Sequence, residues 1–336
     1  MMKIFFVGLM VAGIVMAVYP VCFGEPKIST SVVPLPPSLT GLPTLTPEPW
    51  VQIDPGPDVF LEGPAFDRKG DLFVSSIFDS RILKITPEKK VTTIFSKEGL
   101  LPDGIAIHKD GRLFVVCLTG KIIALNPDGS NLTYIEARYQ GKPQSGNDLV
   151  FDSKGNFYVT DFTGTIADPT GGVYRFSADL NTVKPVIERL AMANGVSLSP
   201  EGNVLWVSVT ASNHLVRLQL QEDGISLDPF EGTHIPYRFM GAAPEGGGCD
   251  SNAVDEEGNL YQCIIFQGRV LILNRGGIPI ANVLIPGRDE GKHLRSTNVA
   301  FKPGTDQVFL TTSGEGGAWI YQFRGLAKGL VLFSHQ

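Results

Sequence analysis

Residues 147–159 carry the pattern from which this chain can be understood: Asn-Asp-Leu-Val-Phe-Asp-Ser-Lys-Gly-Asn-Phe-Tyr-Val. An apolar run at residues 149–151 is followed by a turn that contains Gly155, and then by a second apolar run at residues 157–159. Two short runs of β-branched or aromatic residues around such a turn are typical of a β-hairpin. The stretch therefore predicts two antiparallel strands, and the same pattern recurs along the chain.

Six copies of the pattern follow one another between residues 63 and 323. Adjacent turn glycines lie about 40 to 56 residues apart, which is the period of four-stranded propeller blades. Each copy continues with a further apolar run, and the body shows no sustained helical period. Short strands at even spacing occur in sandwiches, barrels and propellers, and six copies of this length favour an all-β, six-bladed β-propeller. The turn glycines are Gly70, Gly111, Gly155, Gly202, Gly258 and Gly304.

One position of the repeat, five residues before the first turn residue, is polar in every copy, and we call it the slot. Its occupants are Glu62, Asp103, Asn147, Asn194, Asp250 and Thr297. The slot is expected just before the first strand of each blade. Because that strand lies nearest the central channel, the slot side chains should converge at one mouth of the channel. Turn chemistry is the alternative, since Asn-Gly and Asp-Gly are ordinary turn dipeptides, but Glu62 has no special role in turns.

The slot carries side-chain oxygens only, which suits a hard cation. Calcium accepts carboxylate and amide oxygens in a flexible shell, whereas magnesium requires a stricter octahedron. Zinc would call for His or Cys, and neither occupies the slot. We therefore predict one calcium site on the axis, with other divalent ions as alternatives. The sequence signatures of serine hydrolases, zinc proteases, phosphate loops and dinucleotide sites are missing.

Other features of the sequence indicate where the protein is located and which classes of partner it has. Lys3 and the apolar run at residues 4–18 predict a signal peptide or an N-terminal anchor at residues 1–24, followed by a Pro/Ser/Thr-rich linker at 25–49 and the propeller at 50–336. We expect export to the periplasm or beyond, with a membrane contact only through the anchor. A net charge of −6 without a basic block argues against nucleic acid as a partner. A monomer is expected.

Four segments of the repeat resemble the senescence-marker-protein, gluconolactonase and luciferin-regenerating enzyme family. The segments are residues 61–64, 147–152, 193–200 and 250–255. The resemblance extends over the body from about Trp50 onward. It is strongest toward the calcium-dependent lactonases of the drug-responsive type, to which residues 284–297 and 325–329 are similar almost word for word.

The resemblance implies a six-bladed propeller with a divalent ion on its axis. Its metal ligands fall on Glu62, Asn147, Asn194 and Asp250, with Ser251 as an added ligand, and Asp250 also takes the catalytic role. The lactonase subgroup has an acidic residue where this chain has Asn147. Its second, structural calcium needs a longer acidic loop than residues 117–121 provide, so one ion is expected here.

The function implied is hydrolysis of a cyclic ester. Calcium would polarise the carbonyl, and Asp250 would move a proton. Two alternatives stay open: an esterase or phosphotriesterase that uses the same ion, and a non-enzymatic binding propeller that calcium stabilises. Asp103 and Thr297 occupy the slot without a family role, and they are expected either to line the substrate cavity or to form turns. The pairing of Cys117, Cys249 and Cys263 is left open, because their spacing shows no framework.

Overall fold

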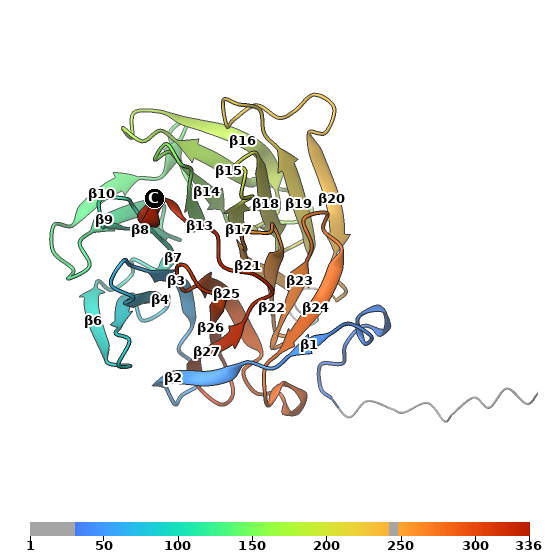
Figure 1. Cartoon of the computed structure of the whole chain (residues 1–336). Helices are drawn as coiled ribbons and strands as arrows, with labels where there is room; N and C mark the ends of the chain where they lie inside the picture. Colours follow the sequence, from blue (N-terminus) through green and yellow to red (C-terminus); the bar gives the residue numbers. More distant parts are fainter. Residues whose placement is uncertain (1–30, 242–247) are drawn as a thin grey trace, which may run out of the picture. The chain divides into compact units, whose positions relative to one another are not determined.

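The computed structural model describes residues 31–241 and 248–336, so the predicted leader at residues 1–24 lies outside the described residues. Within these ranges the chain forms six blades around a central axis, each with four antiparallel strands; a fifth strand adds to one blade, and a two-stranded sheet lies apart from them (Figure 1). The helical segments described are single 3₁₀ turns at Pro37–Leu39, Arg288–Glu290 and Phe333–His335. None of the helices described is long and apolar enough to cross a membrane. The predicted all-β, six-bladed propeller is confirmed.

Each blade runs from an inner strand at the axis to an outer strand at the rim. Blade 1 contains β3 (Leu61–Phe66), β4 (Leu72–Ser76), β5 (Arg81–Ile85) and β6 (Val91–Ser96). Blade 2 contains β7 (Pro102–Ile107), β8 (Leu113–Cys117), β9 (Lys121–Leu125) and β10 (Thr133–Glu136). Blade 3 contains β13 (Gly146–Phe151), β14 (Phe157–Asp161), β15 (Gly171–Phe176) and β16 (Val183–Leu190). Blade 4 contains β17 (Ala193–Leu198), β18 (Val204–Val209), β19 (His214–Gln219) and β20 (Thr233–Arg238). Blade 5 contains β21 (Gly248–Val254), β22 (Leu260–Ile265), β23 (Arg269–Leu273) and β24 (Pro279–Leu284). Blade 6 contains β25 (Arg295–Phe301), β26 (Gln307–Ser313), β27 (Ala318–Arg324) and β2 (Glu48–Asp54).

Both ends of the body contribute to the closure of the ring. The outer strand of blade 6 is the N-terminal β2, which pairs antiparallel with β27, and the inner strand β25 contacts β3 of blade 1. The short strand β1 (Thr44–Leu45) adds to blade 5 in parallel with β24. The folded body therefore begins before the predicted boundary at residue 50. Its Pro-rich composition favoured a linker, but Pro49 lies in an outermost strand, where a missing N–H group is tolerated.

The hydrophobic core lies between neighbouring blades. One cluster, for example, joins Tyr158 and Val173 of blade 3 to Val207 and Leu218 of blade 4. The second strand of each blade is buried along its length, as in Leu72–Ser76, which explains its nearly continuous apolar run. The cysteines of the described residues, Cys117, Cys249 and Cys263, are buried and free.

A β-bulge interrupts the pairing of the first two strands at the slot in all six blades described. The register slips between Glu62 and Ala65 in blade 1, and at the equivalent place in every other blade. The slot residue is the second or third residue of the inner strand. The prediction that it lies just before this strand is therefore wrong. Bulges re-aim side chains and are common beside active sites. Here they turn one polar residue per blade out of the regular alternation.

Candidate metal centre

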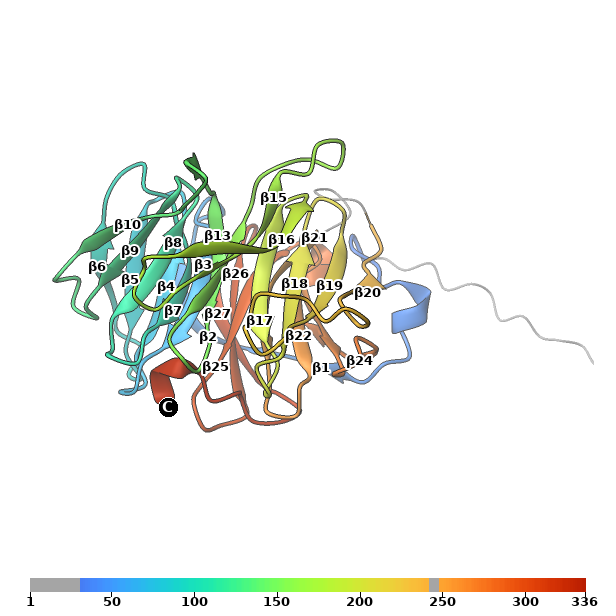
Figure 2. The same ribbon diagram turned by 90° about the horizontal axis from the view of Figure 1, so that it is seen from above.

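The six slot residues sit at equivalent places on the inner strands, which lie side by side around the axis (Figures 1 and 2). All six are at least 93% buried: Glu62, Asp103, Asn147, Asn194, Asp250 and Thr297. Three of them are acids, and a fourth acid, Asp148, follows Asn147 directly. The ring thus combines four carboxylates with two amides at the centre of the fold.

The slot carboxylates are close enough to influence one another. Burial raises the pKa of Glu62 well above its usual value, and the charges of Asp250 and Asp103 raise it further. The pKa of Asp103 is raised by burial first and then by Asp250 and Asp148. Burial also raises the pKa of Asp148 to about 7 and that of Asp250 to about 8. Charges from blades 1, 2, 3 and 5 therefore converge on one region.

No Lys, Arg or His side chain in the described part of the chain forms an ion pair with these four acids. Buried charges are costly unless they are paired or bind a metal ion. Strongly raised pKa values of this origin gather at functional sites. The electrostatics of the ring are those expected of a site that receives a cation.

Hydrogen bonds fix some oxygens of the ring and leave others free. Asn147 Nδ2 donates to Asp103 Oδ2 at 3.0 Å, whereas the Oδ1 atoms of both residues are buried without a partner. Ser251 Oγ donates to Asn194 Oδ1 at 3.3 Å, and Asn298 Nδ2 donates to Glu62 Oε2 at 2.9 Å. The free oxygen of Asn147 belongs to one of the predicted ligands.

The glycines that follow slot residues are explained by close packing of the inner strands. A Cβ atom on Gly195 would lie 2.6 Å from the Cα atom of Ser251 in the next blade. One on Gly104 would lie 2.7 Å from the backbone oxygen of Asn147. Both glycines lie within strands, so the turn explanation of the slot-Gly dipeptides is wrong for these blades. The small residue lets neighbouring bulges approach each other.

Hydroxyl groups on the second strands hold two slot residues from the neighbouring blade. Ser208 Oγ donates to the backbone oxygen of Asp250 at 2.6 Å, and Gln262 Nε2 donates to the same oxygen at 2.7 Å. Ser75 Oγ makes the equivalent contact with the backbone oxygen of Asp103 at 2.6 Å. The two acids held in this way come from blades 2 and 5, which are opposite one another in a ring of six. Their backbone positions are set by contacts between blades.

Thr297 uses its hydroxyl group to join blades 6 and 1. Its Oγ1 donates to the backbone oxygen of Leu61 at 2.7 Å and lies 2.7 Å from Oγ1 of Thr311. The side chain is fully buried. Its predicted place in the substrate cavity stays a prediction, although the hydroxyl group is already engaged by the backbone.

The residues present fit a hard cation by the chemistry of their donors. Among the described residues, no group of three or more His, Cys, Asp and Glu side chains has the spacing of a metal site. The predicted ligand set is of another kind: it combines the carboxylates of Glu62 and Asp250 with the amides of Asn147 and Asn194 and the hydroxyl group of Ser251. The unpartnered, buried Oδ1 of Asn147 is the atom that most directly fits a ligand role.

A cavity of about 1140 Å³ begins one or two residues beyond the slot. Its walls include Asp148, Asn252 and Asn298, the later halves of the inner strands, and the C-terminal residues 330–336. None of the six slot residues lines it. Sequence reasoning missed these three polar residues, although Asp148 and Asn298 directly follow slot residues and Asn252 follows one two positions later. The Gly-containing segments at residues 140–146 and 239–248 are predicted from the sequence to be lid loops over the channel mouth. The first includes strand β12 (Lys142–Pro143), which pairs with β11 (Arg138–Tyr139), and residues 242–247 of the second lie outside the described residues.

Comparison with known proteins gives consistent matches over most of the chain. A family model described as "SMP-30/Gluconolactonase/LRE-like region" matches residues 60–314. Lactonase drp35 of Staphylococcus saprophyticus is 44% identical over 308 residues, which cover 89% of this chain and 93% of that protein. Lactonase drp35 of Staphylococcus aureus (strain USA300) is 44% identical over 317 residues, with 92% and 95% covered.

Solved structures share the fold at lower sequence identity. Luciferin-regenerating enzyme matches with a TM-score of 0.70 at 21% identity, over 84% of this chain and 98% of that chain. Regucalcin of Agrobacterium tumefaciens, described as a calcium-binding protein, matches with a TM-score of 0.68 at 18% identity, over 86% and 98%.

Proposed function

This chain belongs to the SMP-30/gluconolactonase/LRE-like family, and from that premise we propose that it is a calcium-dependent lactonase that acts at the slot. The family model covers residues 60–314, and the staphylococcal relatives are named lactonases. Together they support a lactone-hydrolysing enzyme with a small-molecule lactone as its substrate, in agreement with the class expected from the sequence. The calcium-binding description of regucalcin supports a divalent cation.

The ring of buried acids and amides without a cationic partner is the observation that carries this function. Glu62, Asn147, Asn194, Asp250 and Ser251 would hold the ion with carboxylate, amide and hydroxyl oxygens, which are the donors that calcium prefers. When bound there, calcium would polarise the ester carbonyl and stabilise the charge that develops on its oxygen.

Asp250 is the residue to which we assign proton transfer. Hydrolysis joins a water oxygen to the acyl carbon and breaks the ring C–O bond, so one proton must pass from the water to the departing ring oxygen. A carboxylate within reach of both atoms can take up this proton and return it. Burial raises the pKa of Asp250 in the calcium-free site, and a bound cation would favour the carboxylate form that accepts the proton. Ser208 and Gln262 hold the backbone of Asp250 in place.

Export of the enzyme is part of the proposal. It rests on the apolar run at residues 4–18 behind Lys3, which is typical of a signal sequence. Fractionation of cells that produce the full chain tests it. Recovery in the soluble cytoplasmic fraction alone, with the N-terminus intact, would contradict export.

A substrate panel tests the activity. Purified protein is offered γ- and δ-lactones, an acyclic aryl ester and a phosphotriester, first with calcium and then with excess EGTA. We expect lactone hydrolysis that stops with the chelator and returns when calcium is restored. Preference for the aryl ester or the phosphotriester would replace the lactonase assignment, and lactone turnover that survives chelation would remove the metal from it.

A further inference from the structure

We propose that Asp103 is a positioning residue for the candidate metal centre: its carboxylate holds the amide of Asn147 in the orientation that leaves the amide oxygen free for the ion. This inference rests on the proposed function, because it assigns a task at the same site. Asp103 comes from blade 2 and Asn147 from blade 3, 44 residues apart in the sequence. Asp103 has no assigned role in the family to which the chain is similar.

The hydrogen bond between Asp103 and Asn147 determines the orientation of the Asn147 amide group. A cation bound at the ring would favour the ionised form of Asp103. An ionised carboxylate only accepts hydrogen bonds, whereas an asparagine offers a donor at Nδ2 and an acceptor at Oδ1. The group 3.0 Å from Asp103 Oδ2 is therefore Nδ2 of Asn147. Its Oδ1 must point away from Asp103, and this buried oxygen has no partner in the described residues. A neutral residue at position 103 would not impose this choice.

The neighbouring blades provide an internal comparison. Asn298 of blade 6 also donates its Nδ2 to a slot acid, Glu62 Oε2, at 2.9 Å. Its Oδ1, however, accepts the backbone N–H of Val299 at 2.7 Å. Asn194 also forms a side-chain hydrogen bond with the slot acid Asp250, and its Oδ1 accepts from Ser251 Oγ. Among these three acid–amide pairs of the described residues, the Asp103–Asn147 pair is the one that leaves the amide oxygen unsatisfied. A purely structural contact would be expected to satisfy both ends, as the pair formed by Glu62 and Asn298 does.

Asp103 makes no other side-chain contact that would explain its presence. The side chain is 1% exposed, Oδ1 has no hydrogen-bond partner, and no cationic side chain of the described residues pairs with it. Its backbone oxygen is held by Ser75 Oγ at 2.6 Å, so the acid is placed accurately. Removal of a group that orients a metal ligand through a hydrogen bond typically weakens metal binding about 10–100-fold.

Calcium titration of chelator-stripped protein by calorimetry tests the assignment without an activity assay. Asp103→Asn keeps the size of the side chain but can meet either end of the Asn147 amide, so the orientation is no longer imposed. We expect calcium to bind about 10–100-fold more weakly, with a melting temperature at or above that of the parent protein, because a buried acid has been neutralised. Asp255→Asn, a buried acid in a turn, is the matched control and should leave calcium affinity unchanged.

A charge swap separates orientation from a general loss of binding. In the double variant Asp103→Asn, Asn147→Asp, the introduced amide can donate to the introduced carboxylate across the same contact. We expect calcium affinity within a few-fold of the parent value or tighter. If Asp103→Asn folds poorly, Asp103→Ser removes the carboxylate with less bulk and should lose the same affinity.

The possible results separate the role of Asp103 from the proposed calcium-dependent function on which it rests. Parent protein that binds calcium, together with Asp103→Asn of unchanged affinity, overturns the role of Asp103 alone. A double variant as weak as Asp103→Asn also overturns it, because orientation would then not be what the contact supplies. Parent protein that binds no calcium overturns the metal centre and the inference together.

Discussion

Two sets of buried aspartates in this propeller differ in how their oxygens are satisfied. Those in the turns after the inner strands are enclosed by donors. Asp255 accepts the backbone N–H groups of Glu257 and Asn259 and the side chains of Asn259 and Tyr261. Those at the slot, in contrast, have raised pKa values and no cationic partner among residues 31–241 and 248–336, and within the same ranges one oxygen of Asp103 has no partner at all.

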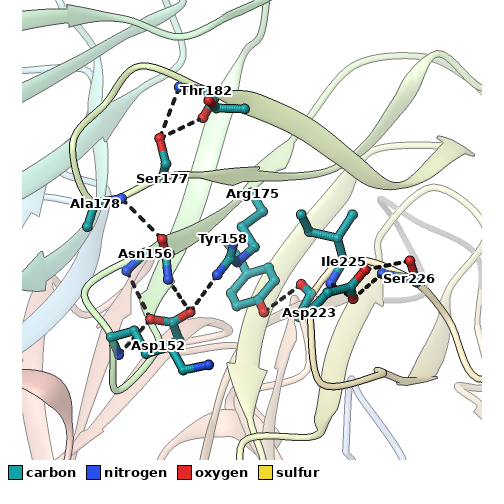
Figure 3. A network of polar contacts seen from close by, with 12 residues as sticks. Asp152, Asn156, Tyr158, Arg175, Ser177, Ala178, Thr182, Asp223, Ile225 and Ser226 are labelled. Atoms are coloured by element: carbon teal, nitrogen blue, oxygen red, sulfur yellow. Dashed lines mark hydrogen bonds and ion pairs between the residues drawn. The ribbon is translucent and has the colours of Figure 1, made fainter.

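The turn of blade 3 shows the same enclosure by donors around a partly exposed aspartate, Asp152 (Figure 3). Asp152 accepts the backbone N–H groups of Lys154 and Asn156 through Oδ1, and the side chains of Asn156 and Arg175 through Oδ2. Its Arg175 partner completes an ion pair at 3.1 Å. An acid of this kind serves the turn in which it lies, whereas the slot acids are a cost to the fold that only a ligand or a reaction can justify.

Replacing one acid of each kind should separate the two roles most clearly. Asp250→Asn keeps the shape of the slot but removes the proton-transfer group, so we expect lactone turnover to fall about 10²–10⁴-fold. In the calcium-free protein the melting temperature should not fall, because a buried acid without a cationic partner is neutralised. Asp255→Asn should do the reverse, with a loss of about 1–3 kcal/mol of stability and normal turnover of the folded fraction. Asp250→Asn turnover within twofold of the parent would contradict the assignment.

The slot acids should also give the calcium-stripped protein an unusual pH dependence. Burial raises the pKa of Asp148 to about 7 and that of Asp250 to about 8, compared with about 3.9 in an unfolded chain. Between about pH 4 and pH 8 the folded state then binds more protons than the unfolded state, so the free energy of unfolding falls as pH rises, by at most about 1.4 kcal/mol per pH unit for each group.

Melting temperatures in EGTA at pH 5, 6, 7 and 8 measure this dependence. They should fall across the series, and saturating calcium should flatten the decline. The turn carboxylates supply the contrast: the hydrogen bonds of Arg112 to Asp110 lower the pKa of that exposed acid, and such a group loses its contribution as pH falls. A melting temperature that rises from pH 5 to pH 8 in EGTA would show that the slot acids are not the dominant titrating groups.

A smaller effect is expected from the hydroxyl group that holds the backbone of Asp250. Ser208→Ala removes the donor at 2.6 Å, while Gln262 keeps its own contact. Loss of one hydrogen bond of about 1 kcal/mol should lower kcat several-fold and leave KM little changed, and Ser208→Thr should restore most of the rate. Ser75→Ala breaks the equivalent contact with Asp103 and serves as the matched variant. An equal loss of kcat in both alanine variants, without rescue by threonine, would indicate a general loosening of the ring.

The repeat made the blades and the slot predictable, because a fixed place in a repeat becomes a fixed place around an axis. Glu62 was informative since it has no use in a turn. The strand β2 could not be predicted in the same way, because its partner β27 is more than 260 residues away in the sequence. The proline-rich composition around Pro49 indicated a linker instead. The bulges were not predicted either, because the alternation of apolar and polar residues does not show where the register of two paired strands shifts.

The chemistry of the ring was predictable only in part. Donor types at the slot indicated a hard cation, but the direction in which each oxygen points depends on side chains from other blades. The contact between Asn147 and Asp103, and that between Asn298 and Glu62, join residues far apart in the sequence. No local sequence pattern specifies these contacts, so Asp103 had no role at the metal site that was predicted from the sequence alone.

The central claim is that the slot, unlike the turns, holds its acids for a cation. Calorimetric titration of the chelator-stripped protein with calcium, compared with Glu62→Gln and Asp255→Asn, tests it most directly. We predict a single calcium per chain for the parent protein and for Asp255→Asn, with binding lost or weakened at least about 100-fold in Glu62→Gln, whose buried carboxylate supplies a proposed ligand charge. Calcium binding of equal strength in all three proteins, or in none of them, would contradict the account.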